Sequence, residues 1–348
     1  MKKIGWFCTY TPVEILHAAG ALPVGIKSNS GAEHEDVVLG DSMCSYVRSC
    51  MGGALSGSYD ALSGVVIAHS CECMRRLADG WLYRQDEIKP KMLHLLDVPK
   101  IVTKSSIAFF AGGLRRMKED IEAHVGPISE EALRASMLTF NKTRALCRAI
   151  DALRKKEAPA VTGREVENLI ASSWEMPREA FNAQLEAFIA DKEGQTGDKD
   201  APRIMIIGGP GNGSLIKTIE AAGAISVVEH MCTGLRAFTG EAAFNEDPFL
   251  ELADLYLTRT PCPRMLGEAA QDAISEIESL IKEYRVDGVL YYAMQFCSNM
   301  QMQWARLKND TPIDVPMKVI DGDISTEINE CEIQSFIKRL KKRRKRNR

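Results

Sequence analysis

The chain has 348 residues, 45% of them hydrophobic, and a formal net charge of −3. This is enough for two ordinary globular domains, and the near-neutral charge excludes a bulk affinity for nucleic acid. No apolar run reaches the ~18 residues of a membrane span, and no signal peptide is recognisable, so we expect a soluble, cytoplasmic protein.

The first hundred residues alternate between strand-like and helix-like segments. Pro12 stands where a first helical turn tolerates proline, and Gly20 where a helix ends. Strands alternating with helices at this spacing favour a parallel sheet. The predicted strands are residues 3–8, 22–26, 64–68 and 98–102, and the predicted helices are 12–19, 42–55 and 73–84.

From residue 105 to 191 the pattern changes to long amphipathic helices without strand candidates, and α/β alternation then resumes. The last eleven residues include nine Lys or Arg without interleaved aromatic residues, which predicts a disordered, solvated tail and no nucleic-acid partner. In the second half, strands are predicted at 203–207, 224–228, 288–292 and 317–320, and helices at 214–222 and 274–284. The predicted organisation is a first α/β half (1–104), a helical insertion (105–193), a linker (194–202), a second α/β half (203–337) and a basic tail (338–348).

Three pairs of segments match in the same order along the two halves. LHAAGALPV (16–24) resembles IEAAGAISV (219–227), and MCSYVR (43–48) resembles MCTGLR (231–236). GVVIAHSC (64–71) resembles GVLYYAMQFC (288–297), and both are apolar strands that end in a cysteine. We infer that the chain is two copies of one α/β unit, with helices inserted after the first.

The repeat places cysteines at equivalent positions. Cys71 and Cys297 end equivalent strands, and Cys44 and Cys232 lie at equivalent strand-to-helix junctions. Ligands of open parallel sheets bind outside the carboxyl ends of the strands, so four thiols would converge in the cleft between the halves. Thiolates suit soft metals, above all iron–sulfur clusters. The alternatives are buried small residues or a redox-active pair.

The remaining cysteines divide into two groups. Cys73 forms a Cys-x-Cys with Cys71, Cys262 is held between two prolines, and Cys8 ends the first strand, so these three are further candidate ligands. The absence of a Cys-x-x-Cys pair argues against a zinc ribbon. Three others are expected to be core residues: Cys50, Cys147 and Cys331.

Several charged and glycine residues accompany the cysteines. The segment GGPGNG (208–213) is either a phosphate-binding loop or a tight turn. Arg48 and Arg236 either hold the negative charge of a cluster or substrate, or form surface ion pairs. Glu14, Glu72 and His69 are candidate proton donors, or else ordinary polar and capping residues.

These motifs resemble the 2-hydroxyacyl-CoA dehydratase and benzoyl-CoA reductase superfamily. The resemblance rests on GWFCTYTPVEILHAAG (5–20), CSYVRS (44–49), SCECMRRL (70–77) and QFC (295–297), followed by residues 313–323. It covers nearly the whole chain except the basic tail. It implies two flavodoxin-like or Rossmann-like halves, a [4Fe–4S] cubane on Cys44, Cys71 and Cys297, and a separate ATP-hydrolysing iron–sulfur activator that injects a low-potential electron.

The extra cysteines resemble those of the double-cubane branch of this superfamily. That branch holds two sulfide-bridged cubanes on six cysteines of one chain, which implies an ATP-dependent reductase of small molecules and a homodimer. The ligands would then be Cys44, Cys71 and Cys297 with three of Cys8, Cys73, Cys232 and Cys262. The alternatives are a 2-hydroxyacyl-CoA dehydratase subunit with one cubane, or a non-catalytic cluster scaffold. Arg75 and Arg76, just after the ligand loop, are candidate contacts of the activator.

Overall fold

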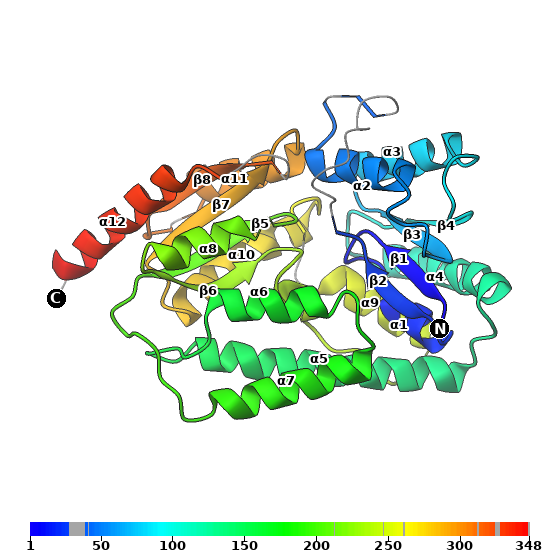
Figure 1. Cartoon of the computed structure of the whole chain (residues 1–348), viewed down its shortest axis with the longest axis horizontal. Coiled ribbons are helices and arrows are strands. Elements are labelled where there is room, and N and C mark those ends of the chain that lie inside the picture. Colours follow the sequence, from blue (N-terminus) through cyan, green and yellow to red (C-terminus); the bar gives the residue numbers. More distant parts are fainter. Residues whose placement is uncertain are drawn as a thin grey trace.

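The computed structural model describes residues 1–27, 39–40, 42–211, 213–245, 247–259, 262–311, 313–323 and 328–346. Outside it lie Asn212 of the glycine-rich loop, Thr260 and Pro261 before Cys262, and the last two residues of the basic tail. Two four-stranded parallel sheets lie side by side, with helices packed around them (Figure 1). The strand orders are β2-β1-β3-β4 and β6-β5-β7-β8. This confirms the predicted α/β fold with two halves, and the shared order is what a duplication would leave.

The first sheet is buried on both faces. In β3, Val65 and Ile67 belong to one core cluster and Val66 and Ala68 to the other, as expected for a central parallel strand. The elements of this half are β1 (Lys3–Trp6), α1 (Val13–Ala18), β2 (Leu22–Gly25), α2 (Ser45–Leu55), β3 (Gly64–His69), α3 (Glu72–Tyr83) and β4 (Met92–Asp97).

The strand predicted at residues 98–102 is wrong. The fourth strand is β4, six residues earlier, where Met92, His94 and Leu96 are buried in alternation. Pro99 lacks the N–H that a strand ladder needs, so the apolar residues after it do not continue the sheet.

The inserted segment is helical, as predicted, and it joins the two halves. Helix α5 packs against α1 of the first half and against β6 of the second, and Figure 1 shows α5 and α7 running beneath both sheets. Thr103, Ser129 and Thr162 cap α4, α5 and α6 through their side-chain oxygens. The bounds are α4 (Lys104–His124), α5 (Glu130–Arg154), α6 (Gly163–Ser172) and α7 (Arg178–Lys192).

The second half contains three helices that the sequence pattern did not predict: α9, α11 and most of α12. Helix α9 follows β6 in the chain but packs on α4 of the insertion. The elements are β5 (Arg203–Gly208), α8 (Ser214–Ala221), β6 (Ile225–His230), the 3₁₀ turn η1 (Leu235–Phe238), α9 (Pro248–Thr258), α10 (Glu268–Glu283), β7 (Gly288–Met294), α11 (Ser298–Asn309), β8 (Met317–Gly322) and α12 (Glu330–Arg346).

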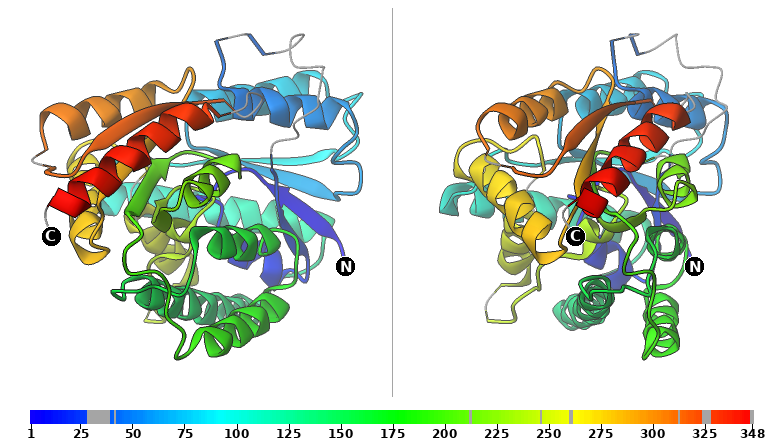
Figure 2. Two further views of the ribbon diagram at one scale, coloured as in Figure 1. Left: turned by 60° about the vertical axis from the view of Figure 1, so that its left-hand side comes forward. Right: turned by 90° about the vertical axis from the view of Figure 1, so that its left-hand side faces the viewer.

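The basic tail is not disordered over residues 338–346, because these residues complete α12. Ile333, Phe336, Ile337 and Leu340 form a buried stripe at helical spacing, and Gly288 of β7 lets Phe336 and Leu340 approach the sheet. Figure 2 shows α12 lying beside the second sheet. Basic side chains in the last turns also interact favourably with the helix dipole.

Both hydrophobic cores extend across the two halves. One cluster joins α2, α3 and β3 to the second sheet, and the other joins α1 and α4 to α5, α7 and α9. No helix within the described residues is long and apolar enough to cross a membrane.

Candidate metal centre

Seven of the ten cysteines lie on loops or at helix ends, near the carboxyl ends of strands. All seven are half-buried. They interact electrostatically across the halves, Cys8 with Cys262 and Cys73 with Cys297. The strand order changes direction between β1 and β3 in the first sheet and between β5 and β7 in the second. Ligands of open α/β sheets bind at such switch points. The first half supplies Cys8, Cys44, Cys71 and Cys73, and the second half supplies Cys232, Cys262 and Cys297.

Cys44, Cys71 and Cys297 share a structural position. Each is the N-cap residue of a helix, namely α2, α3 and α11. The hydrogen bond with Cys73, followed by burial, raises the thiol pKa of Cys44 and Cys71, and burial raises that of Cys297, while a backbone N–H in the first helical turn lowers each. Helix N-termini stabilise thiolates and other anions, so this position favours metal-binding sulfur.

Cys73, in the first turn of α3, contacts two of these residues. The thiols of Cys44 and Cys71 hydrogen-bond to Cys73, which raises the pKa of both donors and lowers the pKa of Cys73. Three sulfurs of the first half are therefore neighbours. The Cys-x-Cys spacing allows this because Cys71 lies just before the helix and Cys73 within its first turn.

Cys232 and Cys262 share a second environment, around Arg236. The Arg236 Nη2 atom lies 4.0 Å from the Cys232 Sγ atom, and Arg236 also interacts with Cys262. Burial raises the pKa of Cys232 to about 12, and Cys262, Cys8 and Cys297 are among its neighbours. The Cys262 N–H donates to the hydroxyl oxygen of Tyr10 at 3.4 Å. Cys232 and Cys262 therefore face the same cleft as the first-half cysteines.

The charges around the cleft suit an anionic group. Arg236 is 8% exposed and Arg264 is 2% exposed, and among the described residues neither forms an ion pair with a carboxylate. The Arg264 guanidinium lies 4.3 Å from the ring centre of Tyr10, and its Nε atom has no hydrogen-bond partner. Buried cations require a compensating negative charge. Several thiolates, or the cluster they would bind, supply it, so the residues present fit an iron–sulfur group.

Within the described residues, no three His, Cys, Asp or Glu side chains are arranged to hold a single metal ion. A cluster places a different requirement on its ligands. Each thiolate binds its own iron, so the sulfurs surround a core of several atoms instead of converging on one point. The cysteines are spread over several loops, which agrees with the requirement of a cluster and not with that of a single metal ion.

Glu14, a candidate proton donor, lies in a buried ion pair away from the thiols. Its carboxylate accepts hydrogen bonds from Arg144 of α5 and, at 2.7 Å, from Tyr256 of α9. Burial opposes ionisation, but Arg144 and the Tyr256 hydroxyl together outweigh it, and the pKa of Glu14 is lowered. This ion pair joins α1 to α5 and α9 and leaves Glu14 no proton to donate at neutral pH.

The other two proton-donor candidates lie at the outer surface. Glu72 is exposed and pairs with Arg75 and Arg76, which lowers its pKa. The His69 Nδ1 atom is 2.8 Å from the Asp97 Oδ1 atom at the end of β4. Both residues are next to the ligand loop in sequence, but their polar partners are Asp97, Arg75 and Arg76.

The structure also places the two candidate arginines and the three cysteines that were expected to be core residues. Arg48 is half-buried on α2, one turn after Cys44, whereas Arg236 lies directly among the thiols. Cys50 and Cys147 are core residues, as predicted. Cys331 is exposed on α12, so its assignment to the core is wrong: it lies on the solvent face, opposite the apolar stripe.

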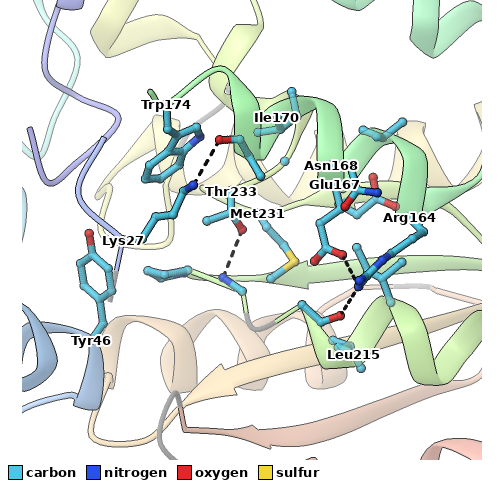
Figure 3. Close-up of a pocket in the computed structure, with 18 of the residues that line it drawn as sticks. Lys27, Tyr46, Arg164, Glu167, Asn168, Ile170, Trp174, Leu215, Met231 and Thr233 are labelled. Atoms are coloured by element: carbon cyan, nitrogen blue, oxygen red, sulfur yellow. Dashed lines mark hydrogen bonds and ion pairs between the residues drawn. The ribbon is translucent and has the colours of Figure 1, made fainter. Parts of the chain in front are cut away.

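A cavity of about 550 Å³ lies beside the cysteine loops, between α6, the glycine-rich loop and the segment after β6 (Figure 3). Met231 and Thr233, on either side of Cys232, line it. The Gly211 N–H donates to the Thr233 Oγ1 atom at 3.1 Å, and a Cβ on Gly211 would lie 2.6 Å from Met231. Glycine here serves close packing, which favours the tight-turn interpretation of this loop.

Sequence reasoning missed two groups of residues near the centre. Tyr10 and Arg264 were both adjacent to candidate cysteines, and that adjacency was the available signal. The residues of α6 that line the cavity carry no such signal, because they belong to the helical insertion, far from every cysteine in sequence.

Comparison with known proteins gives one family. The family model described as "2-hydroxyglutaryl-CoA dehydratase, D-component" matches residues 8–340. The Escherichia coli (strain K12) protein YjiM is 27% identical over 93% of this chain and 86% of its own. One of the benzoyl-CoA reductase polypeptides of Thauera aromatica is 26% identical over 85% and 78%, respectively. The (R)-phenyllactyl-CoA dehydratase beta subunit of Clostridium sporogenes is 22% identical over 97% and 92%.

Proposed function

Because the chain belongs to the 2-hydroxyglutaryl-CoA dehydratase D-component family, we propose that it is an iron–sulfur subunit that receives low-potential electrons from an ATP-hydrolysing activator. The relatives are dehydratases and reductases, so the chain is of an enzyme type, and the scaffold hypothesis is set aside. The observation that supports the proposal is the shared N-cap position of Cys44, Cys71 and Cys297 on helices of both halves, together with the electrostatic interaction of Cys297 with Cys73.

The first form of the proposal is a double-cubane reductase of small molecules, working as a homodimer in the cytoplasm. Its support is that three further cysteines share the cleft. The six ligands would be Cys44, Cys71, Cys73, Cys232, Cys262 and Cys297, with Cys8 as the alternative. A bound cluster of this kind would supply electrons at low potential to a small substrate. The chain contributes sulfur ligands, buried guanidinium groups that balance negative charge, and two packed halves that exclude water.

The second form is a 2-hydroxyacyl-CoA dehydratase subunit with a single cubane on Cys44, Cys71 and Cys297. Its support comes from relatives named as dehydratases of (R)-phenyllactyl-CoA and (R)-2-hydroxyglutaryl-CoA. In this form Cys232 and Cys262 would not bind iron.

The proposal is tested by the iron content of protein purified without oxygen. We expect Cys71→Ser and Cys297→Ser each to lose most of the bound iron, since each removes an N-cap ligand from a different half. Cys147→Ser and Cys331→Ser are the matched controls, one buried and one exposed, and both should keep the iron of the natural chain. Full iron retention in Cys297→Ser would rule out a site between the halves.

The same measurement separates the two forms. The double cubane predicts about eight irons per chain and a loss of iron in Cys232→Ser and Cys262→Ser, whereas the single cubane predicts about four irons and no loss. Turnover with ATP and the activator then distinguishes reduction of a small molecule from elimination of water from a 2-hydroxyacyl-CoA.

A further inference from the structure

The cavity between α6 and the loops after β5 and β6 is built from three parts of the chain (Figure 3). Ile26 belongs to the end of the first sheet, Ile170 to the helical insertion, and Leu215 and Met231 to the second half. Its volume, about 550 Å³, lies within the range of pockets for small organic molecules, which form preferentially at such junctions. The cavity is therefore a candidate binding site.

Trp174 is fixed in the wall of this cavity by contacts with the first sheet. A Cβ atom on Gly25 would lie 2.2 Å from the indole Cε3 atom, so a larger residue at this position of β2 would displace the ring. The Gly25 N–H donates to the Trp174 carbonyl at 2.8 Å, and the ring centre of Trp6 is 4.9 Å from that of Trp174. The wall is thus formed before a ligand enters, which lowers the cost of binding.

The charges of the cavity lining balance one another. The lining contains two cations and two carboxylates: Lys27, Arg164, Glu167 and Glu229. Arg164 lies 3.1 Å from Glu167, and the other two have partners outside the lining, with Lys27 2.8 Å from Glu175 and Glu229 2.6 Å from Arg154. A charged ligand would enter a site whose own charges are already compensated, and burying an unpaired charge is costly. The lining therefore disfavours ions of either sign.

The glycine-rich loop does not supply an anion site in place of a free cation. Loops that bind anions direct free backbone N–H groups at the ligand. Here the Gly211 N–H donates to the Thr233 Oγ1 atom at 3.1 Å, and the Gly213 carbonyl accepts from Arg164 at 3.0 Å (Figure 3). The described part of this loop is engaged with its own neighbours.

The polar groups that remain open at the cavity are uncharged donors. Trp174 is 7% exposed, and its indole N–H donates no hydrogen bond within the described residues, although the nitrogen is not among the fully enclosed atoms. Thr233 is half-buried and accepts the Gly211 N–H, which leaves its own hydroxyl proton for another acceptor. The Tyr46 hydroxyl, by contrast, is engaged with two backbone carbonyls. A largely buried donor without a partner gains stability when an acceptor enters.

We propose that this cavity binds an uncharged organic molecule with an apolar body and a hydrogen-bond-accepting oxygen, as in a carbonyl compound. The body packs against Ile170, Leu215 and Met231, and the oxygen accepts from the Trp174 N–H or the Thr233 hydroxyl. The inference goes beyond the proposed function, because it concerns binding alone and requires no cluster. Its failure would leave the iron measurements on the cysteine variants unaffected.

Ligand-observed NMR titration of the full chain with three probes of nearly the same shape tests the charge preference. The probes are benzamide, which is uncharged, benzamidinium and benzoate. We expect benzamide to bind at least about tenfold more tightly than either ion, because an ion would bring an uncompensated charge into the cavity. Equal or tighter binding of either ion, or no binding of benzamide at millimolar concentration, would overturn the proposal.

A cavity-filling variant locates the binding. Ala171→Trp places a large side chain in the lining without changing a charge, and it should abolish benzamide binding. Ala190→Trp, at an exposed position of α7, is the matched control and should leave the affinity unchanged. Unchanged affinity in Ala171→Trp would place the binding elsewhere and contradict the proposal.

Two further variants test the hydrogen bond to the ligand oxygen. Trp174→Phe removes the indole N–H but keeps an aromatic ring, and Thr233→Val removes the hydroxyl but keeps the shape of the side chain. We expect at least one of them to weaken benzamide binding about two- to tenfold, the effect of one lost hydrogen bond. Thr233→Ser, which keeps the hydroxyl, and Trp304→Phe, on α11 outside the lining, are the controls. If both test variants bind benzamide as tightly as the natural chain, the proposed recognition is wrong.

Discussion

At the scale of single residues, the Glu14–Arg144 pair shows how a buried charge holds distant helices together. Both side chains are essentially inaccessible, and Tyr256 completes the hydrogen bonding of the carboxylate. Removing one partner of such a pair leaves an uncompensated charge in the core. Glu14 therefore matters to the packing of α1, α5 and α9, whichever reaction the chain performs.

We expect Glu14→Gln to lower the free energy of unfolding by about 3–5 kcal/mol at pH 7. The folded state lowers the pKa of Glu14, so its stabilising contribution is present above the ordinary carboxyl pKa and disappears as the pH falls through the lowered one. The difference between variant and natural chain should accordingly shrink from pH 7 toward pH 3.

Urea unfolding curves at several pH values measure this difference. Glu179→Gln, which removes an exposed partner of His17, is the control and should change stability by less than about 0.5 kcal/mol. A Glu14→Gln variant as stable as this control would contradict the assigned role.

The candidate cysteines were predictable because the ends of strands can be located from apolar runs that stop at a polar residue. Cys71 and Cys297 follow such runs, in β3 and β7, whereas Cys44 was located through its match with Cys232. The roles of acidic residues were not predictable in this way. Glu14 faces α5, 130 residues away in sequence at Arg144, and only the packing of the insertion reveals its partner.

At the scale of elements, α3 combines two candidate ligands with a surface group of charges. Cys73 lies in its first turn, and Arg75 and Arg76 follow immediately. Each arginine pairs with both Glu72 and Asp79, at 3.0–3.9 Å. The four charges cancel, so this surface is close to neutral and less suited to long-range steering than two free arginines would be.

Reversing both charges, in Arg75→Glu/Arg76→Glu, replaces this neutral group with four carboxylates. We expect slower ATP-coupled reduction by the activator at low salt, with unchanged iron content and unchanged reduction by a small chemical reductant. Arg339→Glu, on the distant helix α12, is the matched control. Unaffected activator-driven rates in the α3 variant would move the docking surface away from this helix.

Helices and strands were predicted correctly where the apolar residues follow one clear periodicity. They were missed where that pattern is interrupted or where packing against other elements determines the structure. The buried strands β3 and β5 read as unbroken apolar runs, and α4 to α7 as amphipathic repeats. The position of β4 was missed because the buried His94 interrupts its apolar run, while residues 98–102 contain both Pro99 and Lys100. Helix α9 packs on α4, but its start also carried a local signal that was missed, since Asp247 is its N-cap and Pro248 its first residue.

At the scale of the whole molecule, the shared cores make the two halves one folding unit. Residues of α2 and α3 belong to the same hydrophobic cluster as the second sheet, and α5 contacts both halves. Since each of the two hydrophobic clusters contains residues of both halves, unfolding of one half would expose part of both cores.

We therefore expect a single unfolding transition in urea at fixed iron content. Tryptophan fluorescence reports on the first half through Trp6 and Trp81, on the segment after α6 through Trp174 and on α11 through Trp304, whereas far-UV circular dichroism reports on all helices. The two curves should coincide. Separate midpoints would mean that the halves unfold independently despite the shared cores.

The wide separation of the N-cap cysteines in the chain has a consequence for biosynthesis. Cys44 and Cys297 are 253 positions apart, and at ~5–20 residues per second a ribosome needs roughly 13 to 50 s to pass from one to the other. During that interval the thiols of the nascent first half have no counterpart to complete a site. If the cluster is held as proposed, its insertion cannot be completed until Cys297 has been synthesised, late in the chain, and the delivering machinery must act on a site that both halves form.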